Sequence, residues 1–216
     1  MKISAQNKYL QQLINESTEN LENIVTVSNN IYHNRLFEVR FEIPKNWHLI
    51  SINKYKEIIQ GQKINIPDEE KNKLIEEMAG VACYISKYSL DNDEKDGIIS
   101  PVICFTIDAK DAFTKNLSLE DYIALLDNKV ASSAIKGFKI LEKGEPQKLN
   151  NVDSITYKTE YLFEHEELEE GVMVEMNVLN IDHGDVFLDF SMTQCKAQGE
   201  IAQNEFDSFV NSIRLG

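Results

Sequence analysis

The stretch FEVRFEIPKNWHL, residues 37–49, decides the fold more than any other part of the sequence. Apolar and polar residues alternate over 36–43, which is the pattern of a strand with one buried face. The apolar face consists of Phe37, Val39, Phe41 and Ile43. Pro44 ends the strand because it has no N–H to donate to a neighbouring strand. We therefore predict a half-buried strand over 36–43.

Trp47, the only tryptophan in the chain, follows this strand directly. A single large aromatic residue at the end of a strand is usually a packing residue. We interpret Trp47 as folding back over the sheet, with its indole N–H bonded near the sheet edge.

The rest of the chain shows further helical and strand-like patterns. Apolar residues at three- and four-residue spacing predict helices over 5–28, 117–137 and 199–213, and Pro67 opens a further helix. The predicted strands are 81–89, 98–108, 152–163, 172–181 and 185–194. Short connections between consecutive strands favour antiparallel pairing.

This order of elements predicts an α+β fold, a mainly antiparallel sheet covered by helices. We divide the chain into an N-terminal helical extension, residues 1–30, and a single domain, residues 31–216. A helical insertion at about 53–80 interrupts the domain. The helix at the N-terminus is an addition to this fold.

The composition is acidic, with a formal net charge of −14 and a pI of about 4.7. Such a surface repels phosphate backbones and anionic lipids, so nucleic acid and membranes are poor partners. A basic protein or a cation is favoured instead. The first residues carry no signal peptide, so we expect a cytoplasmic protein, or an envelope protein if the printed sequence lacks its native N-terminus. The sequence does not determine the oligomeric state.

The three cysteines, Cys83, Cys104 and Cys195, all lie in apolar, strand-like runs without a CxxC motif. We interpret them as buried, reduced thiols that pack as small apolar residues. A disulfide between Cys83 and Cys104 on neighbouring strands is the alternative.

Three stretches together resemble the PsbP-like superfamily: FEVRFEIPKNW (37–47), LSLEDYIALL (117–126) and FDSFVNSI (206–213). Asn46 stands where the family often has glycine, and the N-terminal helix and the long segment over 53–80 are departures. The family includes the extrinsic subunit of photosystem II, a Ran-binding nuclear-transport factor and many bacterial proteins. The resemblance implies an α/β/α sandwich, a bacterial member, and protein binding rather than catalysis.

Motifs of catalysis and cofactor binding are missing from the sequence. It contains no GxGxxG, GxxxxGK, GxSxG or HExxH motif, and its four histidines have no metal-ligand spacing. We therefore expect neither an enzyme nor a cofactor.

Two acidic loops are weak candidates for a metal site, and mobile charged hairpin tips are the alternative. The first is DNDEKDG, which fails the pattern of a calcium-binding loop in both registers. The candidate ligands are Asp91, Asp93 and Asp96 in this loop, and Glu166, Glu167 and Glu170 in EHEELEEG.

Asp189 and Glu175 are the remaining pair of carboxylates to weigh for acid–base chemistry. Asp189 alternates with Leu188 and Phe190, so we favour an exposed position for its side chain.

These observations support a non-enzymatic, acidic protein-interaction or accessory module. A protein that binds a small molecule or a divalent cation is the alternative, and a hydrolase with an unrecognised site is the third hypothesis.

Overall fold

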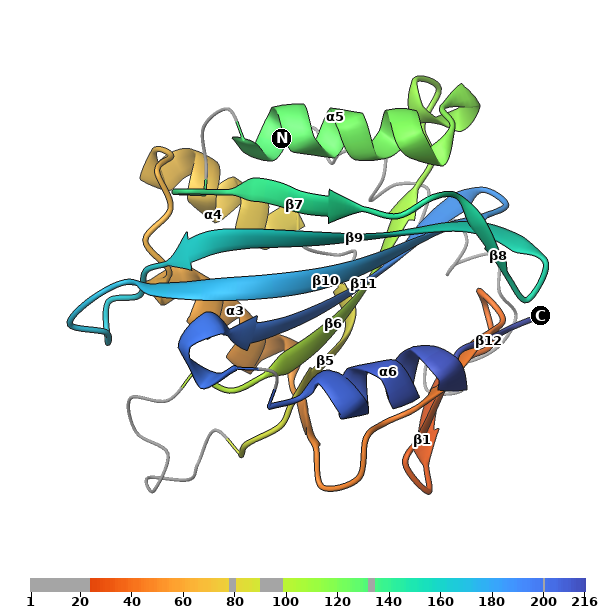
Figure 1. Ribbon diagram of the computed structural model, residues 1–216, viewed down its shortest axis with the longest axis horizontal. Helices are drawn as coiled ribbons and strands as arrows, with labels where there is room; N and C mark the ends of the chain where they lie inside the picture. The colour runs from red at the N-terminus through yellow and green to blue at the C-terminus, as the bar shows by residue number, and fades with distance from the viewer. Residues whose placement is uncertain (1–23, 78–80, 90–98, 132–134, 200) are drawn as a thin grey trace.

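The computed structural model describes residues 24–77, 81–89, 99–131, 135–199 and 201–216. All strand pairs in these residues are antiparallel, and they form two sheets (Figure 1). The α+β class and the antiparallel pairing predicted from the sequence are therefore confirmed.

The larger sheet has the strand order β4-β5-β6-β11-β10-β9-β7, and β8 pairs with β9. Its strands are β4 (His48–Ile50), β5 (Val81–Ser86), β6 (Val102–Ala109), β7 (Lys139–Lys143), β8 (Gln147–Leu149), β9 (Val152–Phe163), β10 (Val172–His183) and β11 (Val186–Cys195). The smaller sheet has the order β1-β2-β3-β12. Its strands are β1 (Val25–Ser28), β2 (Ile31–Asn34), β3 (Val39–Glu42) and β12 (Arg214–Leu215).

In two hairpins of these sheets, a pair of asparagines forms the turn between the strands. Asn29 and Asn30, between β1 and β2, have φ angles of 52° and 61°. Asn150 and Asn151, between β8 and β9, have φ angles of 50° and 69°. A tight two-residue hairpin of type I′ needs positive φ at both central residues, and asparagine adopts that conformation more readily than most residues. Each Asn-Asn pair therefore fixes a hairpin.

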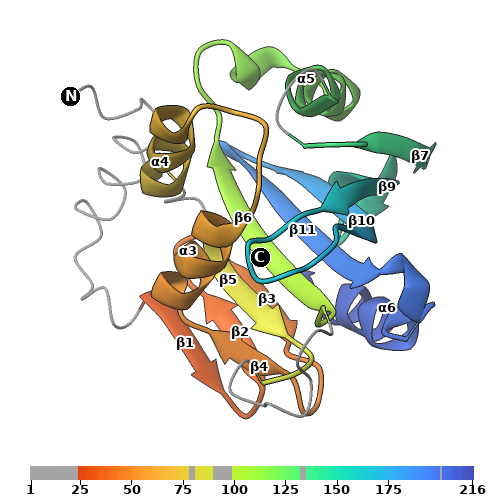
Figure 2. The same ribbon diagram turned by 90° about the vertical axis from the view of Figure 1, so that its left-hand side faces the viewer.

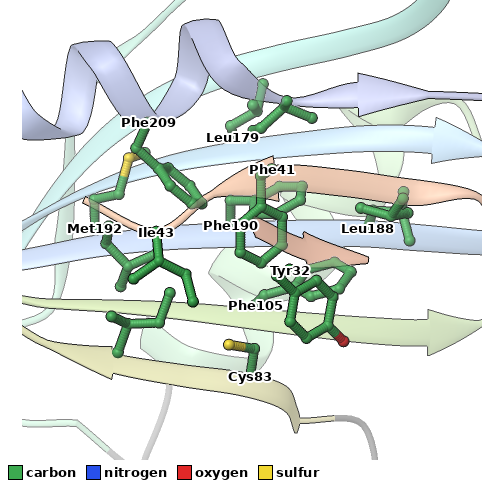
Figure 3. Packing of buried hydrophobic residues seen from close by; sticks show 14 of the residues in the cluster. Tyr32, Phe41, Ile43, Cys83, Phe105, Leu179, Leu188, Phe190, Met192 and Phe209 are labelled. Carbon is green, nitrogen blue, oxygen red and sulfur yellow. The ribbon is translucent and has the colours of Figure 1, made fainter. Parts of the chain in front are cut away.

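The main core lies between the two sheets and includes an aromatic cluster (Figure 3). The ring of Phe41 stacks on Tyr32, with centroids 4.5 Å apart, and meets Phe209 edge-on at 5.1 Å. Phe105 and Phe190 stack on each other at 4.5 Å, and both rings meet Phe41 edge-on. We call the side of the larger sheet that carries Phe105 and Phe190 the α6 face, because α6 (Gln203–Ser212) also packs there.

The predicted strand over 36–43 is confirmed in its alternation, but it is shorter. Val39, Phe41 and Ile43 are buried, and Phe37 is partly buried in the preceding turn. β3 begins only at Val39 because Glu38 has a φ of 50°, a left-handed conformation that a strand does not accommodate. The chain therefore changes direction before the strand starts.

Trp47 is 8% exposed and packs against the core, as predicted. Its ring meets Phe206 at a centroid distance of 5.9 Å, and Lys87 Nζ lies 5.9 Å from the ring centroid. Asn46, with a φ of 67°, makes the turn that carries the chain from Pro44 to the tryptophan.

α5 (Leu119–Ala131) covers the opposite side of the larger sheet, which we call the α5 face. Ser118 Oγ accepts a hydrogen bond from the Asp121 N–H and donates one to Asp121 Oδ2, which caps the N-terminus of the helix. The Tyr122 ring stacks on Phe187 at 4.0 Å. This contact anchors a second, smaller cluster, formed by Leu119, Tyr122, Ile123, Ile155 and Phe187.

α3 (Ile52–Gly61) and α4 (Asp68–Glu77) form the helical segment expected within 53–80. Tyr55 on α3 lies 4.2 Å from the ring of Tyr84 on β5. In the strand register Tyr84 lies opposite Cys104, which lies opposite Ser191, so Tyr84 is on the α5 face. Figure 2 shows α5 on one side of the larger sheet and α6 on the other. Among the described residues no helix is both long and apolar enough to cross a membrane.

The predicted helix over 5–28 is wrong at its C-terminal end, because residues 25–28 form β1. The β-branched residues Val25, Thr26 and Val27 favour a strand, and the Asn-Asn turn pairs that strand with β2. The predicted helix before residue 24 lies outside the described residues. The β1–β2 hairpin also crosses the division that we placed at residue 30.

A second difference concerns the cover of the larger sheet. The sequence predicted a cover of helices, but on the α6 face the smaller sheet supplies much of it. The reason is that residues 25–34 form the strands β1 and β2, which pair with β3 and β12 as a separate, smaller sheet.

Gly61 closes α3 beneath His165, where a side chain would not fit. A Cβ atom on Gly61 would lie 2.3 Å from His165 Nε2, an atom that also lies 3.1 Å from the Ile58 carbonyl oxygen. We expect Gly61→Ala to lower the free energy of unfolding by about 1–3 kcal/mol, because the imidazole must move. Urea unfolding followed by circular dichroism measures the change.

The control is the same substitution in a His165→Ala background, where no ring opposes the new methyl group. There Gly61→Ala should cost close to nothing, since alanine favours a helix more than glycine does. Equal costs in both backgrounds would contradict the assigned contact.

Candidate functional site

A groove of about 520 Å³ lies between α6 and the larger sheet, where strands β7, β9, β10 and β11 line it. This volume is within the range of ligand-binding sites in proteins. We call it the α6 groove. Its lining residues are Glu142, Gly144, Thr156, Tyr157, Lys158, Asn177, Val178, Met192, Gln203, Phe206, Asp207, Val210 and Asn211.

Helix α6 forms one wall of the groove, and two adjacent rows of its side chains explain its orientation. Phe206 and Phe209 are buried in the main core, where Phe209 packs on the aromatic cluster and Phe206 on Trp47. The neighbouring stripe, Gln203, Asp207 and Val210, recurs at spacings of four and three residues and therefore shares one side of the helix. Because Phe206 and Phe209 are anchored in the core, Gln203, Asp207 and Val210 are turned toward the groove.

The opposite wall comes from strands, and a chain of amide hydrogen bonds joins it to the helix. Asn177 on β10 donates from Nδ2 to Gln203 Oε1 at 3.3 Å. Gln203 in turn donates from Nε2 to Asp207 Oδ1 at 2.8 Å. These bonds hold three polar side chains of the groove in fixed positions.

Three lysines on the α6 face of the larger sheet form ion pairs with glutamates. Lys158 Nζ lies 3.0 Å from Glu175 Oε2. The side chain of Glu160 is only 5% exposed and forms two ion pairs. Lys139 Nζ lies 2.5 Å from Glu160 Oε1, and Lys196 Nζ lies 2.6 Å from Glu160 Oε2. Hydrogen bonds from the ammonium groups of Lys139 and Lys196 hold the pKa of Glu160 below its usual range. Lys139, Lys158 and Lys196 are therefore already paired.

The groove thus combines an apolar floor with a polar, acidic rim. Met192, Phe206 and Val210 supply the apolar surface. Glu142 and Asp207 contribute carboxylates at the rim, and neither has an ion-pair partner among the residues described. Such a site provides apolar contact, amide hydrogen bonding and an attraction for cationic groups.

The predicted metal ligands are only partly described. Asp91, Asp93 and Asp96 lie outside the described residues. Glu166, Glu167 and Glu170 are exposed in the connection between β9 and β10, where Glu167 Oε2 lies 3.8 Å from His165 Nδ1. The described part of the chain holds no group of three or more His, Cys, Asp or Glu side chains suited to a metal ion.

The exposed position that we favoured for Asp189 is wrong. Its side chain is half-buried under α5, where its carboxylate meets the Tyr122 hydroxyl at 3.0 Å. Strand alternation alone does not reveal that a helix covers the α5 face. Glu175 lies on the α6 face beside Lys158, so the two carboxylates are on opposite sides of the sheet and do not form a catalytic pair.

The cysteines are buried and free, as predicted. In the register of β5 and β6, Cys83 lies opposite Phe105 and Cys104 lies opposite Tyr84. The two thiols therefore point to opposite faces of the larger sheet, and the alternative of a disulfide between them is excluded.

The α6 groove was not identified from the sequence. The two polar residues Gln203 and Asp207, beside the apolar stripe of α6, are the signal that was available. No sequence pattern indicates that they face Glu142, Lys158 and Asn177, because three separate strands bring those residues together.

No protein-family model and no curated protein matches the chain. Among solved structures, the solution structure of cyanobacterial PsbP from Synechocystis matches with a TM-score of 0.48 and 9% identity, over 92% of this chain and 99% of that one. The crystal structure of LpqN, involved in cell envelope biogenesis of Mycobacterium tuberculosis, matches with a TM-score of 0.48 and 9% identity, over 82% of each chain. A protein of unknown function from Pseudomonas aeruginosa matches with a TM-score of 0.44 and 14% identity, over 85% of this chain and 91% of that one. A PsbP protein is thus among the solved structures that match this chain.

Proposed function

We propose that the protein is a non-enzymatic interaction module, and that the α6 groove binds an extended, basic segment of a partner protein. The observation that carries this proposal is the composition of the groove, an apolar floor with carboxylates and fixed amides around it. Peptide-binding grooves combine the same elements, since apolar pockets hold side chains and polar groups bond the peptide backbone.

The charge of the partner follows from the ion pairs around the groove. Lys158 is neutralised by Glu175, whereas Glu142 and Asp207 face the groove without an ion-pair partner in the described structure. The chain as a whole carries a net charge of −14. Both the local and the overall field therefore attract lysine and arginine side chains and repel acidic segments.

A peptide library tests this proposal. The purified protein would be offered random peptides of about ten residues, which reach about 33–36 Å when fully extended. We expect enrichment of peptides in which lysine or arginine flanks apolar residues, with binding that weakens as salt is added. Enrichment of acidic peptides, or of none, would overturn the proposal.

The site itself is tested by the charge reversal Glu142→Lys with Asp207→Lys. Both carboxylates are exposed at the rim, so the variant should fold and should lose at least about tenfold in peptide affinity, which corresponds to about 1.4 kcal/mol. Isothermal titration calorimetry with the best peptide of the selection measures the loss.

The matched control is Glu169→Lys with Glu170→Lys, in the exposed connection between β9 and β10. This variant has the same net charge as the groove variant, but the groove is unchanged. Equal loss of affinity in both variants would show a general charge effect and would rule out the α6 groove as the binding site.

A further inference from the structure

Strand β1 differs from the other edge strands that the structure describes. The edge strands β4, β8 and β12 have only two or three residues each, and β7 carries two lysines and an irregular register with β9. Short length, lysines and irregular pairing all keep a sheet edge from pairing with another chain. β1, at the outer end of the smaller sheet (Figure 2), has four uncharged residues, no proline and a regular register with β2. Its edge therefore has none of these protections.

The backbone groups of β1 alternate between those that face β2 and those that face away from it. The Arg35 N–H donates to the Ile24 carbonyl oxygen at 2.8 Å, so Ile24 faces β2. Because facing alternates along an antiparallel strand, Thr26 also faces β2, whereas the N–H and C=O groups of Val25 and Val27 face away. No described residue bonds these outward groups. The edge therefore offers two donors and two acceptors to another strand.

The side chains of the same two valines extend the apolar side of the smaller sheet beyond the core. Val27 lies opposite Tyr32 in the strand register, and Val25 lies opposite Asn34. Facing residues point to the same side of a sheet, and Tyr32 belongs to the main core. Val25 and Val27 are nevertheless 38% and 44% exposed. An added strand would cover apolar surface that the described residues leave open.

This edge is complementary to a second copy of itself. Because facing residues share a side of the sheet, a strand that pairs in antiparallel with its own copy must be centred on a residue. Centred on Thr26, Val25 lies opposite Val27 of the second copy, and each such pair exchanges both N–H···O bonds. Every outward group is then bonded, and the valines of both copies lie side by side. Centred on Val27 instead, Val25 would face the turn residue Asn29, whose φ of 52° does not fit a strand.

We propose that two copies of this chain associate through β1, so that their smaller sheets form one continuous sheet across a two-fold axis. An uncharged edge selects neither a basic nor an acidic strand, whereas its hydrogen-bonding groups and its valines match their own copy. The association is independent of the proposed peptide binding, because the α6 groove is lined by α6 and the larger sheet.

Sedimentation equilibrium of the unmodified protein tests this association. A pair of four-residue strands is a small interface, so we expect a dissociation constant between about 10 µM and about 1 mM. Over this range of concentration the average mass should rise from the 24.8 kDa of one chain toward twice that value. A mass that stays at one chain throughout would overturn the proposal.

Salt separates this association from peptide binding. Each copy carries a net charge of −14, so the two copies repel each other at long range and added salt screens the repulsion. Association through β1 should therefore become stronger as salt is added, whereas binding of a basic peptide to the α6 groove should become weaker. Self-association that weakens with salt would contradict an uncharged interface.

Val27→Lys makes the test specific. The two-fold axis places the new ammonium group in the interface twice, so the dissociation constant should rise at least about tenfold. The matched control is Leu141→Lys on β7, because Val27 and Leu141 are equally exposed, at 44%, and the charge change is the same. Circular dichroism checks that both variants fold, and Val25→Lys serves if Val27→Lys does not. Equal weakening by the control, or none by either valine variant, would refute pairing through β1.

Amide hydrogen exchange locates the interface. The amides of Val25 and Val27 should gain protection as the protein concentration is raised through the dissociation constant, because their N–H groups are bonded only in the pair of copies. The amide of Thr26, which faces β2, should be protected at every concentration. A doubled mass without added protection at Val25 and Val27 would place the contact elsewhere and reject the proposal, while peptide binding to the α6 groove would stand.

Discussion

Replacement of Phe41 by alanine is expected to lower the free energy of unfolding by about 3–5 kcal/mol, the largest loss among the substitutions considered. The side chain is fully buried between the two sheets and contacts the rings of Tyr32, Phe105, Phe190 and Phe209. Its removal leaves a cavity in the centre of the aromatic cluster and abolishes these ring pairs, each worth about 0.5–1.5 kcal/mol beyond the buried area.

Urea unfolding followed by circular dichroism and by Trp47 fluorescence measures this loss. Since a domain of this size is stable by only about 5–15 kcal/mol, the midpoint should move to a clearly lower urea concentration. The control is Phe113→Ala, because Phe113 is 66% exposed and its loss should change stability by less than about 0.5 kcal/mol. Similar losses for both variants would mean that Phe41 is not at the centre of the core.

The second large effect is expected for Trp47→Ala, a loss of about 3 kcal/mol, at the lower end of the range for buried aromatic residues. The lower end applies because Trp47 packs at the edge of the core, with Phe206 as its aromatic neighbour and Lys87 above its ring. Circular dichroism is the appropriate probe, since the variant has no tryptophan.

Trp47→Phe distinguishes packing from recognition at this position. Phenylalanine keeps an apolar ring against Phe206, so it should recover most of the lost stability, whereas a direct contact with a partner would not be restored by it. A Trp47→Ala variant with unchanged stability but without peptide binding would assign the tryptophan to the binding surface instead of the core.

The pair Trp47 and Phe206 also connects the fold to the proposed groove. Phe206 packs against Trp47 and at the same time lines the α6 groove. Stability lost at Trp47 should therefore loosen α6 and weaken peptide binding, while the rim substitutions Glu142→Lys and Asp207→Lys should weaken binding alone. This difference separates the structural residues of the groove from its recognition residues.

Local patterns in the sequence were sufficient to predict the longer helices and strands that bury one side. Strand β9 was predicted with its observed ends, Val152 and Phe163, and α5 (Leu119–Ala131) lies within the helix predicted over 117–137. These features depend on residues next to one another in the chain, where alternation, helical spacing and capping are direct consequences of backbone geometry. The short strands β4, β7, β8 and β12 were missed because two to five residues carry too little pattern.

The Asn-Asn pairs show a local signal that was present but not used. Asn29-Asn30 and Asn150-Asn151 stand between strand-like residues, and both form tight turns with positive φ. Reading the first pair as a hairpin would have replaced the end of the predicted N-terminal helix by β1 and β2.

The sequence by itself determined the antiparallel α+β class, the buried side of β3, the packing role of Trp47 and the reduced state of the cysteines. Only the tertiary structure decided where Asp189 lies, which residues face α6, and that Cys83 and Cys104 point to opposite sides. The physical reason is that a local pattern states which side of an element is apolar, but not which other element covers it. Asp108, Asp189 and Tyr122 are brought together by two strands and a helix, and Glu142, Asn177 and Asp207 by the same kind of assembly. Contacts of this kind exist only once the sheets and helices have packed.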